Sequence, residues 1–146
     1  MKNKIFLFVF FISFFSQSCN DRYRNETISF QNYLSNTFKQ KIPEVEHIYL
    51  LVSRFGCPNC IDQALIKISE KTVNKQEIGI TIVTYDTTLV SKTFIKRAKI
   101  LFDNNAEYET ILPIANLALI KTERGKISKI KILNLDEMEK IIGEEF

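Results

Sequence analysis

The sequence contains no tryptophan, one histidine and three cysteines among 146 residues. A hydrolase triad pairs a histidine with a nucleophilic serine, and no Gly-x-Ser-x-Gly elbow accompanies His47 here. Zinc requires four nitrogen, sulfur or oxygen ligands, whereas Cys57, Cys60 and His47 are the only obvious candidates. His47 begins an expected strand and should lie at its far end from the cysteines. These shortages argue against a hydrolase and weaken the case for a metal site.

The positive and negative charges of the sequence are also nearly balanced. The formal net charge is +3 at pH 7, and two of the positive residues, Lys2 and Lys4, stand near the N-terminus. Without residues 1–18 the net charge is +1 and 128 residues remain, which suits one domain with a hydrophobic core. This balance argues against nucleic acid as a partner. A chain of this size needs no disulfide for stability, which favours a chemical role for its cysteines.

The N-terminal residues have the layout of a secretory signal. Positive residues precede an apolar run of 11 residues, 5–15, and residues 16–18 (Ser-Gln-Ser) offer small side chains at a cleavage point. The run is too short for a transmembrane helix, which requires about 20 residues. We therefore expect residues 1–18 to be a signal peptide.

Cys19 follows directly. Ser18-Cys19 resembles the end of the lipobox of bacterial lipoproteins, although Ser16 stands where leucine is usual. The resemblance implies that Cys19 is acylated and that residues 19–44 form a lipid-anchored tether, in which residues 28–41 suit a helix. Ordinary secretion, with Cys19 as a free thiol, is the alternative. Residues 45–146 are then the folded domain.

The region around the other two cysteines shows regular patterns. Residues 47–53 form an uncharged apolar run, as in a strand buried on both faces. An amphipathic helix is predicted to follow Cys57, which would occupy the N-cap, with Pro58 in the first turn. The apolar stripe of this helix is Ile61, Ala64, Leu65, Ile68 and Thr72.

The rest of the chain continues this alternation. A second strand is expected at 78–86, a helix after Ser91, a third strand within 115–121, and a short helix after Asn134. Gly125 is predicted to be left-handed in a turn, and residues 126–133, with three lysines, suit an edge strand. The apolar side of the helix after Ser91 would be Phe94, Ile95, Ala98, Leu101 and Phe102.

The order β-α-β-α-β-β-α, with Cys57-Pro58-Asn59-Cys60 between the first strand and helix, resembles the thioredoxin fold. The resemblance covers residues 45 to the end and implies an α/β protein, a three-layer α/β/α sandwich with a mixed sheet. Small exported thioredoxin-like lipoproteins of Bacteroidetes-type bacteria are similar. In such proteins the two residues between the cysteines tune the redox potential.

A helix N-terminus lowers the pKa of a thiol through its exposed N–H groups. Cys57 is therefore the expected nucleophile toward a client disulfide, and Cys60 the residue that resolves the mixed disulfide. Phe55 and Gly56 leave an apolar, uncrowded approach for a partner. These residues, with Pro58 and Asn59, form the candidate site.

Three positions depart from thioredoxin. Gly56 replaces the tryptophan before the first cysteine, and apolar Leu51 stands where a buried acid assists proton transfer. The cis-proline that faces the cysteines falls at about Asn116; Pro113, three residues earlier, is the other candidate.

The leading hypothesis is a membrane-anchored, extracytoplasmic thiol-disulfide oxidoreductase of the periplasm or cell envelope. It implies client proteins and a membrane electron carrier as partners, and no cofactor. The alternative is a non-catalytic thioredoxin-like binding module whose Cys57–Cys60 disulfide is structural. A metal site ranks third. A peroxiredoxin is disfavoured because residues 53–56 lack the threonine and proline that precede its reactive cysteine.

Overall fold

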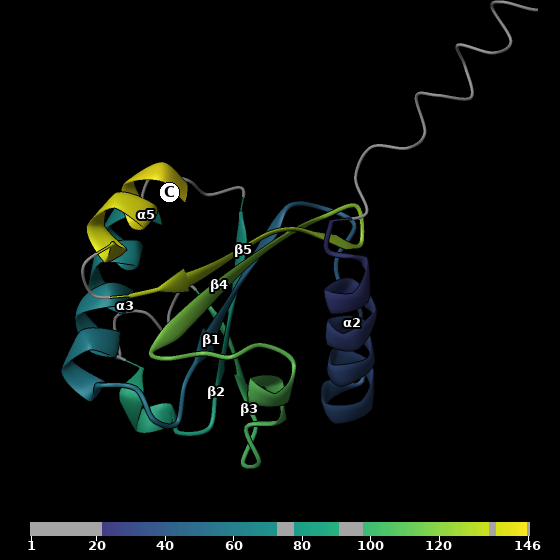
Figure 1. The fold of residues 1–146 in the computed structure, drawn as a ribbon, viewed down its shortest axis with the longest axis horizontal. Coiled ribbons are helices and arrows are strands. Elements are labelled where there is room, and N and C mark those ends of the chain that lie inside the picture. The colour runs from purple at the N-terminus through teal and green to yellow at the C-terminus, as the bar shows by residue number, and fades with distance from the viewer. Residues whose placement is uncertain (1–21, 73–77, 91–97, 135–136, 146) are drawn as a thin grey trace, which may run out of the picture.

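The computed structural model describes residues 22–72, 78–90, 98–134 and 137–145. Five strands form one sheet in the order β3-β2-β1-β4-β5 (Figure 1). Strands β1, β2 and β3 run parallel, and β4 is antiparallel to both β1 and β5. The strands are β1 His47–Val52, β2 Gly79–Thr84, β3 Lys99–Phe102, β4 Leu117–Glu123 and β5 Lys126–Leu133. Without edge strand β3, the order β2-β1-β4-β5 with β4 reversed is that of the thioredoxin-like sheet, which confirms the predicted fold class.

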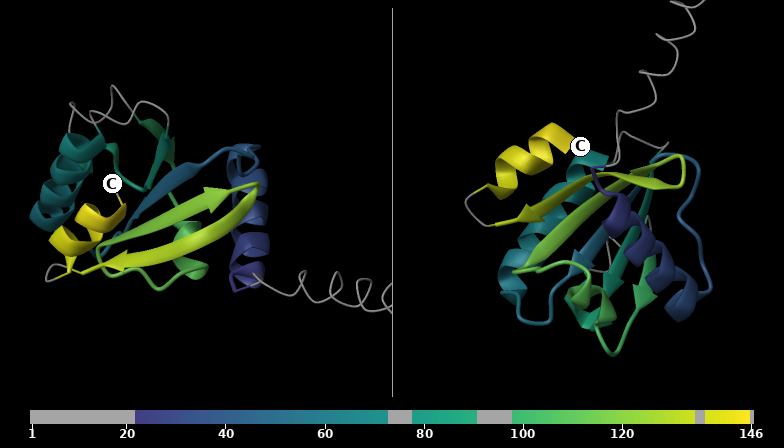
Figure 2. Two further views of the ribbon diagram at one scale, coloured as in Figure 1. Left: turned by 90° about the horizontal axis from the view of Figure 1, so that it is seen from above. Right: turned by 45° about the vertical axis from the view of Figure 1, so that its right-hand side comes forward.

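Helices cover both faces of the sheet. Helices α3 (Pro58–Thr72) and α5 (Met138–Glu145) lie on one face, and α2 (Arg24–Phe38) lies on the other (Figures 1 and 2). Side chains alternate along a strand, so Ile48 and Leu50 of β1 belong to the core under α3, whereas Tyr49 and Leu51 belong to the core under α2. The result is an α/β/α sandwich with two apolar cores.

Helix α2 begins at Arg24, four residues before the range expected from the sequence. Residues 24–27, which the sequence indicated as tether, therefore belong to the helix. Its Phe30 is fully buried, with the ring nearly perpendicular to that of Tyr49 at 5.0 Å between centroids. The helix ends at Phe38, and the C-cap Lys39 has a left-handed φ of 56°. The Gln40 amide donates to the Leu34 carbonyl. α2 is thus integral to the second core.

The prediction of a helix over residues 98–102 is wrong. Residues 99–102 form β3, which pairs in parallel with residues 81–84 of β2, and residues 91–97 lie outside the described part. Leu101 is buried against the α2 core and Phe102 is half exposed. The apolar spacing fits both a helical stripe and an edge strand, and pairing with β2 decides in favour of the strand.

The hairpin between β4 and β5 follows the sequence prediction. Its two-residue turn has φ of 53° at Arg124 and 69° at Gly125, both left-handed, as in a type I′ turn. The amides of these residues donate to the Glu44 and Pro43 carbonyls, which ties the turn to the segment entering β1. β5 is an edge strand, as its lysines indicated. Among the described residues, no helix is long and apolar enough to cross a lipid bilayer.

Replacing Phe30 with alanine should lower the free energy of unfolding by about 3–5 kcal/mol, because it leaves a cavity under β1. Urea denaturation of residues 20–146 would measure this. The matched control is Ile28→Ala on the same helix, where the side chain is 52% exposed; its effect should stay within about 0.5 kcal/mol. Equal effects of the two substitutions would show that α2 does not contribute to the folded domain in solution.

Candidate active site

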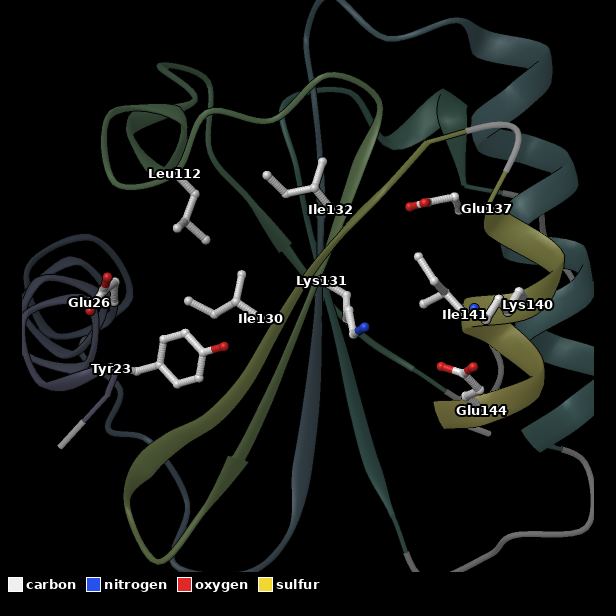
Figure 3. A pocket seen from close by; sticks show the side chains of 10 residues that line it. All are labelled: Tyr23, Glu26, Leu112, Ile130, Lys131, Ile132, Glu137, Lys140, Ile141 and Glu144. Atoms are coloured by element: carbon white, nitrogen blue, oxygen red, sulfur yellow. The ribbon is translucent and has the colours of Figure 1, made fainter. Parts of the chain in front are cut away.

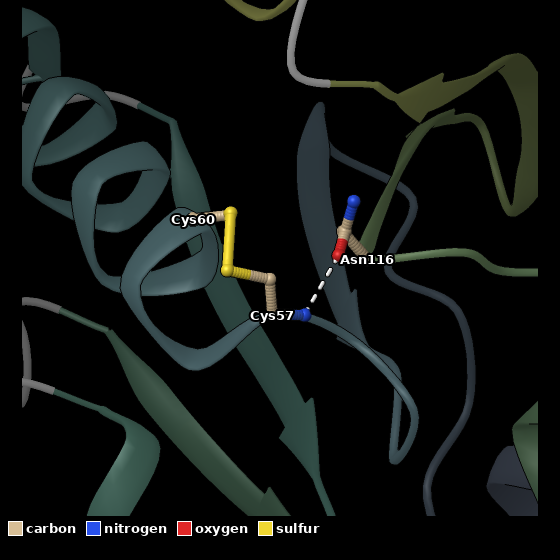
Figure 4. Close-up of a disulfide and its surroundings, with 3 residues drawn as sticks. All are labelled: Cys57, Cys60 and Asn116. Atoms are coloured by element: carbon tan, nitrogen blue, oxygen red, sulfur yellow. Dashed lines mark hydrogen bonds between the residues drawn. A yellow bond between two sulfur atoms is a disulfide. The ribbon is translucent and has the colours of Figure 1, made fainter.

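Cys57 and Cys60 form a disulfide at the start of α3, with 5.2 Å between their Cα atoms (Figure 4). The Cys57 carbonyl accepts the first helical hydrogen bond, from the Ile61 amide at 3.0 Å, so Cys57 is the N-cap as predicted. Cys57 is exposed and Cys60 is half-buried. The more exposed of the two cysteines is therefore the expected nucleophile.

The loop between β1 and α3 has internal hydrogen bonds. Ser53 is buried; its hydroxyl accepts the Phe55 amide at 3.2 Å and its carbonyl accepts the Gly56 amide at 3.4 Å. Phe55 is nevertheless 84% exposed. A large apolar side chain is thus held in solvent beside the disulfide.

Gly56 is required by close packing. A Cβ atom built on it would lie 2.8 Å from Cδ1 of Ile61 and 3.1 Å from Cα of Asn116. A larger residue would therefore have to displace the Ile61 side chain and would crowd the backbone of Asn116. This close packing gives a steric reason for glycine, instead of the tryptophan of thioredoxin, at position 56.

Glu109 was not identified from the sequence. It lies in the short 3-10 helix η2 (Glu107–Thr110), and its carboxylate accepts the Arg54 amide at 2.6 Å and the Arg54 Nε at 3.2 Å. The Tyr85 hydroxyl donates to the Arg54 carbonyl at 3.3 Å. Arg54 is thus paired with Glu109, and its guanidinium lies 5.5 Å from the centre of the Phe55 ring.

Buried Tyr108 also holds the start of the loop between β1 and α3. The hydroxyl of fully buried Tyr108 donates to the Val52 carbonyl, where β1 ends. Burial is the largest cause that raises the pKa of Tyr108, and the nearby Glu109 carboxylate adds to it, so the hydroxyl remains a donor. No local sequence signal marks Tyr108 or Glu109, because both act through tertiary contacts.

Asn116, rather than Pro113, faces the disulfide. Its Oδ1 accepts the Cys57 amide at 2.9 Å (Figure 4), and its backbone carbonyl accepts the Ser53 amide at 2.9 Å. Pro113 is exposed in the segment between η2 and β4. The described residues include no cis peptide bond. The predicted substrate-facing roles of both residues, and of Pro58 and Asn59, which are exposed, stay predictions.

The position expected for a buried acid is apolar, as the sequence indicates: Leu51 is fully buried. Among the described residues, the buried carboxylate is that of Asp103, which directly follows β3. It accepts hydrogen bonds from the Tyr33 hydroxyl at 3.0 Å and the Glu107 amide at 2.8 Å. Burial first, and then this carboxylate, raise the pKa of Tyr33 well above its usual value. Asp103 thus joins η2 to α2.

His47 lies at the opposite end of β1 from the cysteines. Its Nε2 is 2.8 Å from the Thr81 hydroxyl oxygen, and burial, then the charge of Lys99, lower its pKa. Within the described ranges, no group of three His, Cys, Asp or Glu side chains is placed to hold a metal ion. The contacts of His47 are therefore those of a packing residue.

A cavity of about 530 Å³ lies elsewhere, across edge strand β5 (Figure 3). Its lining includes Tyr23 and Glu26 of the α2 region, Ile130 and Lys131 of β5, and Lys140 of α5. No residue of the loop between β1 and α3 (residues 53–57, the disulfide loop) contributes to the cavity. It is separate from the candidate site.

No protein-family model and no curated protein matches the chain. Among solved structures, a peroxiredoxin-like protein from Aquifex aeolicus aligns with 16% identity and a TM-score of 0.46, covering 70% of this chain and 72% of that one. A secreted Mycobacterium tuberculosis disulfide oxidoreductase homologous to E. coli DsbE has 11% identity, a TM-score of 0.48, and coverage of 70% and 84%.

The exposed lipoprotein thioredoxin Etrx1 from Streptococcus pneumoniae aligns with 11% identity, a TM-score of 0.43, and coverage of 70% and 87%. These TM-scores all lie below 0.5, so the similarities carry no argument about function. The fold class rests on the strand order and directions, and the chemistry rests on the site itself.

Glu109→Gln should increase the alkylation rate of Cys57 in the reduced protein at pH 7 by about two- to fivefold, because Arg54 then becomes an uncompensated cation three residues before the thiolate. Iodoacetamide kinetics would measure the rate. The control is the double variant Arg54→Gln/Glu109→Gln, which should return to the original rate. Equal rates in the single and double variants would rule out an effect of the Arg54 charge.

Proposed function

We propose that this protein is a thiol-disulfide oxidoreductase that exchanges electrons with client proteins through Cys57 and Cys60. The observation that carries the proposal is the disulfide between an exposed Cys57 at the N-cap of α3 and a half-buried Cys60. Amides at a helix start stabilise a thiolate at the N-cap. Cys57 is the more exposed residue, and Cys60 is close enough to resolve the intermediate.

The exchange transfers two electrons. The Cys57 thiolate attacks one sulfur of a client disulfide, forms a mixed disulfide and releases the other client sulfur as a thiolate. Cys60 then loses its proton and attacks the Cys57 sulfur, which releases the second client thiolate and forms the Cys57–Cys60 disulfide. The client disulfide is reduced and the protein pair is oxidised. A membrane electron carrier is the proposed source of the electrons that reduce the pair again.

Insulin reduction by residues 20–146 should proceed with dithiothreitol as electron source and be lost in Cys57→Ser. Cys60→Ala should accumulate client proteins as mixed disulfides on Cys57, because the resolving thiol is missing. Turbidity measures the first reaction, and non-reducing electrophoresis measures the second. Equal inactivity of the unmodified protein and Cys57→Ser, with no trapped client, would contradict the oxidoreductase proposal.

A non-catalytic binding module is the second candidate. The observation that favours it is Asn116 in the position before β4, where the resemblance implies a cis-proline. In this case Cys57–Cys60 is a structural bond. Titration against glutathione or dithiothreitol buffers separates the two functions, because a structural disulfide has a potential below about −300 mV.

We further propose that the protein is exported and held at the membrane by a lipid on Cys19. The support comes from the signal-like pattern of residues 1–18, which lie outside the described part of the chain. Cells that express the full chain should incorporate labelled palmitate into it, and Cys19→Ser should abolish the label. A mature protein without label would contradict the anchor and leave the oxidoreductase proposal intact.

A further inference from the structure

The start of α3 leaves few amides for the Cys57 sulfur. The Ile61 amide is the first to bond within the helix, so the amides that precede it have no helical acceptor. Pro58 has no N–H, and the Cys57 amide donates to Asn116. The amides of Asn59 and Cys60 are therefore the two that remain for a thiolate on Cys57.

Asn116 joins the two ends of the disulfide loop. Its backbone carbonyl accepts the amide of Ser53, where the loop leaves β1, and its side-chain Oδ1 accepts the amide of Cys57, where the loop enters α3. Gly56 packs closely against its Cα, because a Cβ atom on Gly56 would lie only 3.1 Å from it. One residue before β4 thus fixes both the path of the loop and the orientation of the first cysteine.

The other half of the Asn116 carboxamide is directed away from Cys57. Because an amide must donate to Oδ1, the hydrogen bond assigns the two atoms of the carboxamide. Nδ2 is then turned away from the Cys57 nitrogen (Figure 4). Within the described part of the chain, Nδ2 has no hydrogen-bond partner, and Asn116 is only partly buried.

We propose that Asn116 is the positioning residue of the exchange reaction: Oδ1 holds Cys57 in place, and Nδ2 donates a hydrogen bond to a main-chain carbonyl of a polypeptide client. The inference rests on the proposed function and adds the residue and the atom that would recognise the client. A polypeptide disulfide brings main-chain carbonyls beside its sulfurs, whereas a small disulfide such as hydroxyethyl disulfide brings none. Asn116 therefore favours polypeptides.

Two substitutions distinguish the contributions of Oδ1 and Nδ2 of the carboxamide. Asn116→Asp keeps an oxygen that accepts the Cys57 amide and removes the donor, and Asn116→Ala removes both. Rates are measured with insulin and with uncharged hydroxyethyl disulfide, at a pH where Cys57 is fully ionised in each variant. The quantity compared is the ratio of the two rates, which cancels changes in Cys57 reactivity.

Both substitutions should lower the insulin-to-hydroxyethyl-disulfide ratio by about two- to tenfold, the effect of one lost hydrogen bond. Asn104→Ala, at an exposed position of the turn after β3, is the matched control and should leave the ratio unchanged. An unchanged ratio in both Asn116 variants, with the unmodified protein active, overturns the proposed donor. Inactivity of the unmodified protein toward both disulfides overturns the proposed function instead.

Hydrogen exchange of the Cys57 amide tests the other atom without reference to activity. The amide should be protected in the unmodified protein and in Asn116→Asp, and should exchange at least about tenfold faster in Asn116→Ala. Two-dimensional NMR on labelled protein measures the rates and shows whether each variant is folded. Equal protection in a folded Asn116→Ala protein would overturn the role of Oδ1.

Discussion

The burial of β1 on both faces is the constraint on which the site depends. A shift of one residue along β1 would exchange Ile48 and Leu50 with Tyr49 and Leu51, and so place each set in the wrong core. β1 is also paired along both edges, in parallel with β2 and antiparallel with β4. The register is therefore fixed, and with it the point near Val52 at which the chain leaves the sheet toward Cys57.

Arg54, Phe55 and Cys57 of the loop from 53 to 57 are exposed, yet distant segments hold the loop in place. β1, β2 and β3 all end on one side of the sheet, where the ends of their strands lie together. Antiparallel β4 starts on the same side. From this side, Tyr85, Glu109 and Asn116 each bond to the loop. A reactive side chain on a loop requires this kind of support, because its geometry must not depend on the loop's own flexibility.

The elements with clear local patterns could be predicted from the sequence. The sequence pattern near each residue predicts the strand at 47–53, the helix after Cys57 and the left-handed turn at Gly125. Counting back from this turn also places Asn116 opposite the cysteines. β3 could not be predicted, because four residues at a sheet edge become a strand only through pairing with β2. Glu109 could not be predicted either, since a glutamate in a polar segment carries no sign of its bonds to Arg54.

The structure leaves fewer groups to stabilise a thiolate on Cys57 than the sequence indicates. The sequence offers the helix start as the source of stabilisation for a thiolate. In the structure Arg54 is paired with Glu109, Pro58 contributes no amide, and Asn116 takes the amide of Cys57. What remains is the pair of amides from Asn59 and Cys60, whose direction is set by how α3 packs on the sheet. The chemistry proposed for Cys57 is therefore coupled to the apolar core beneath the helix.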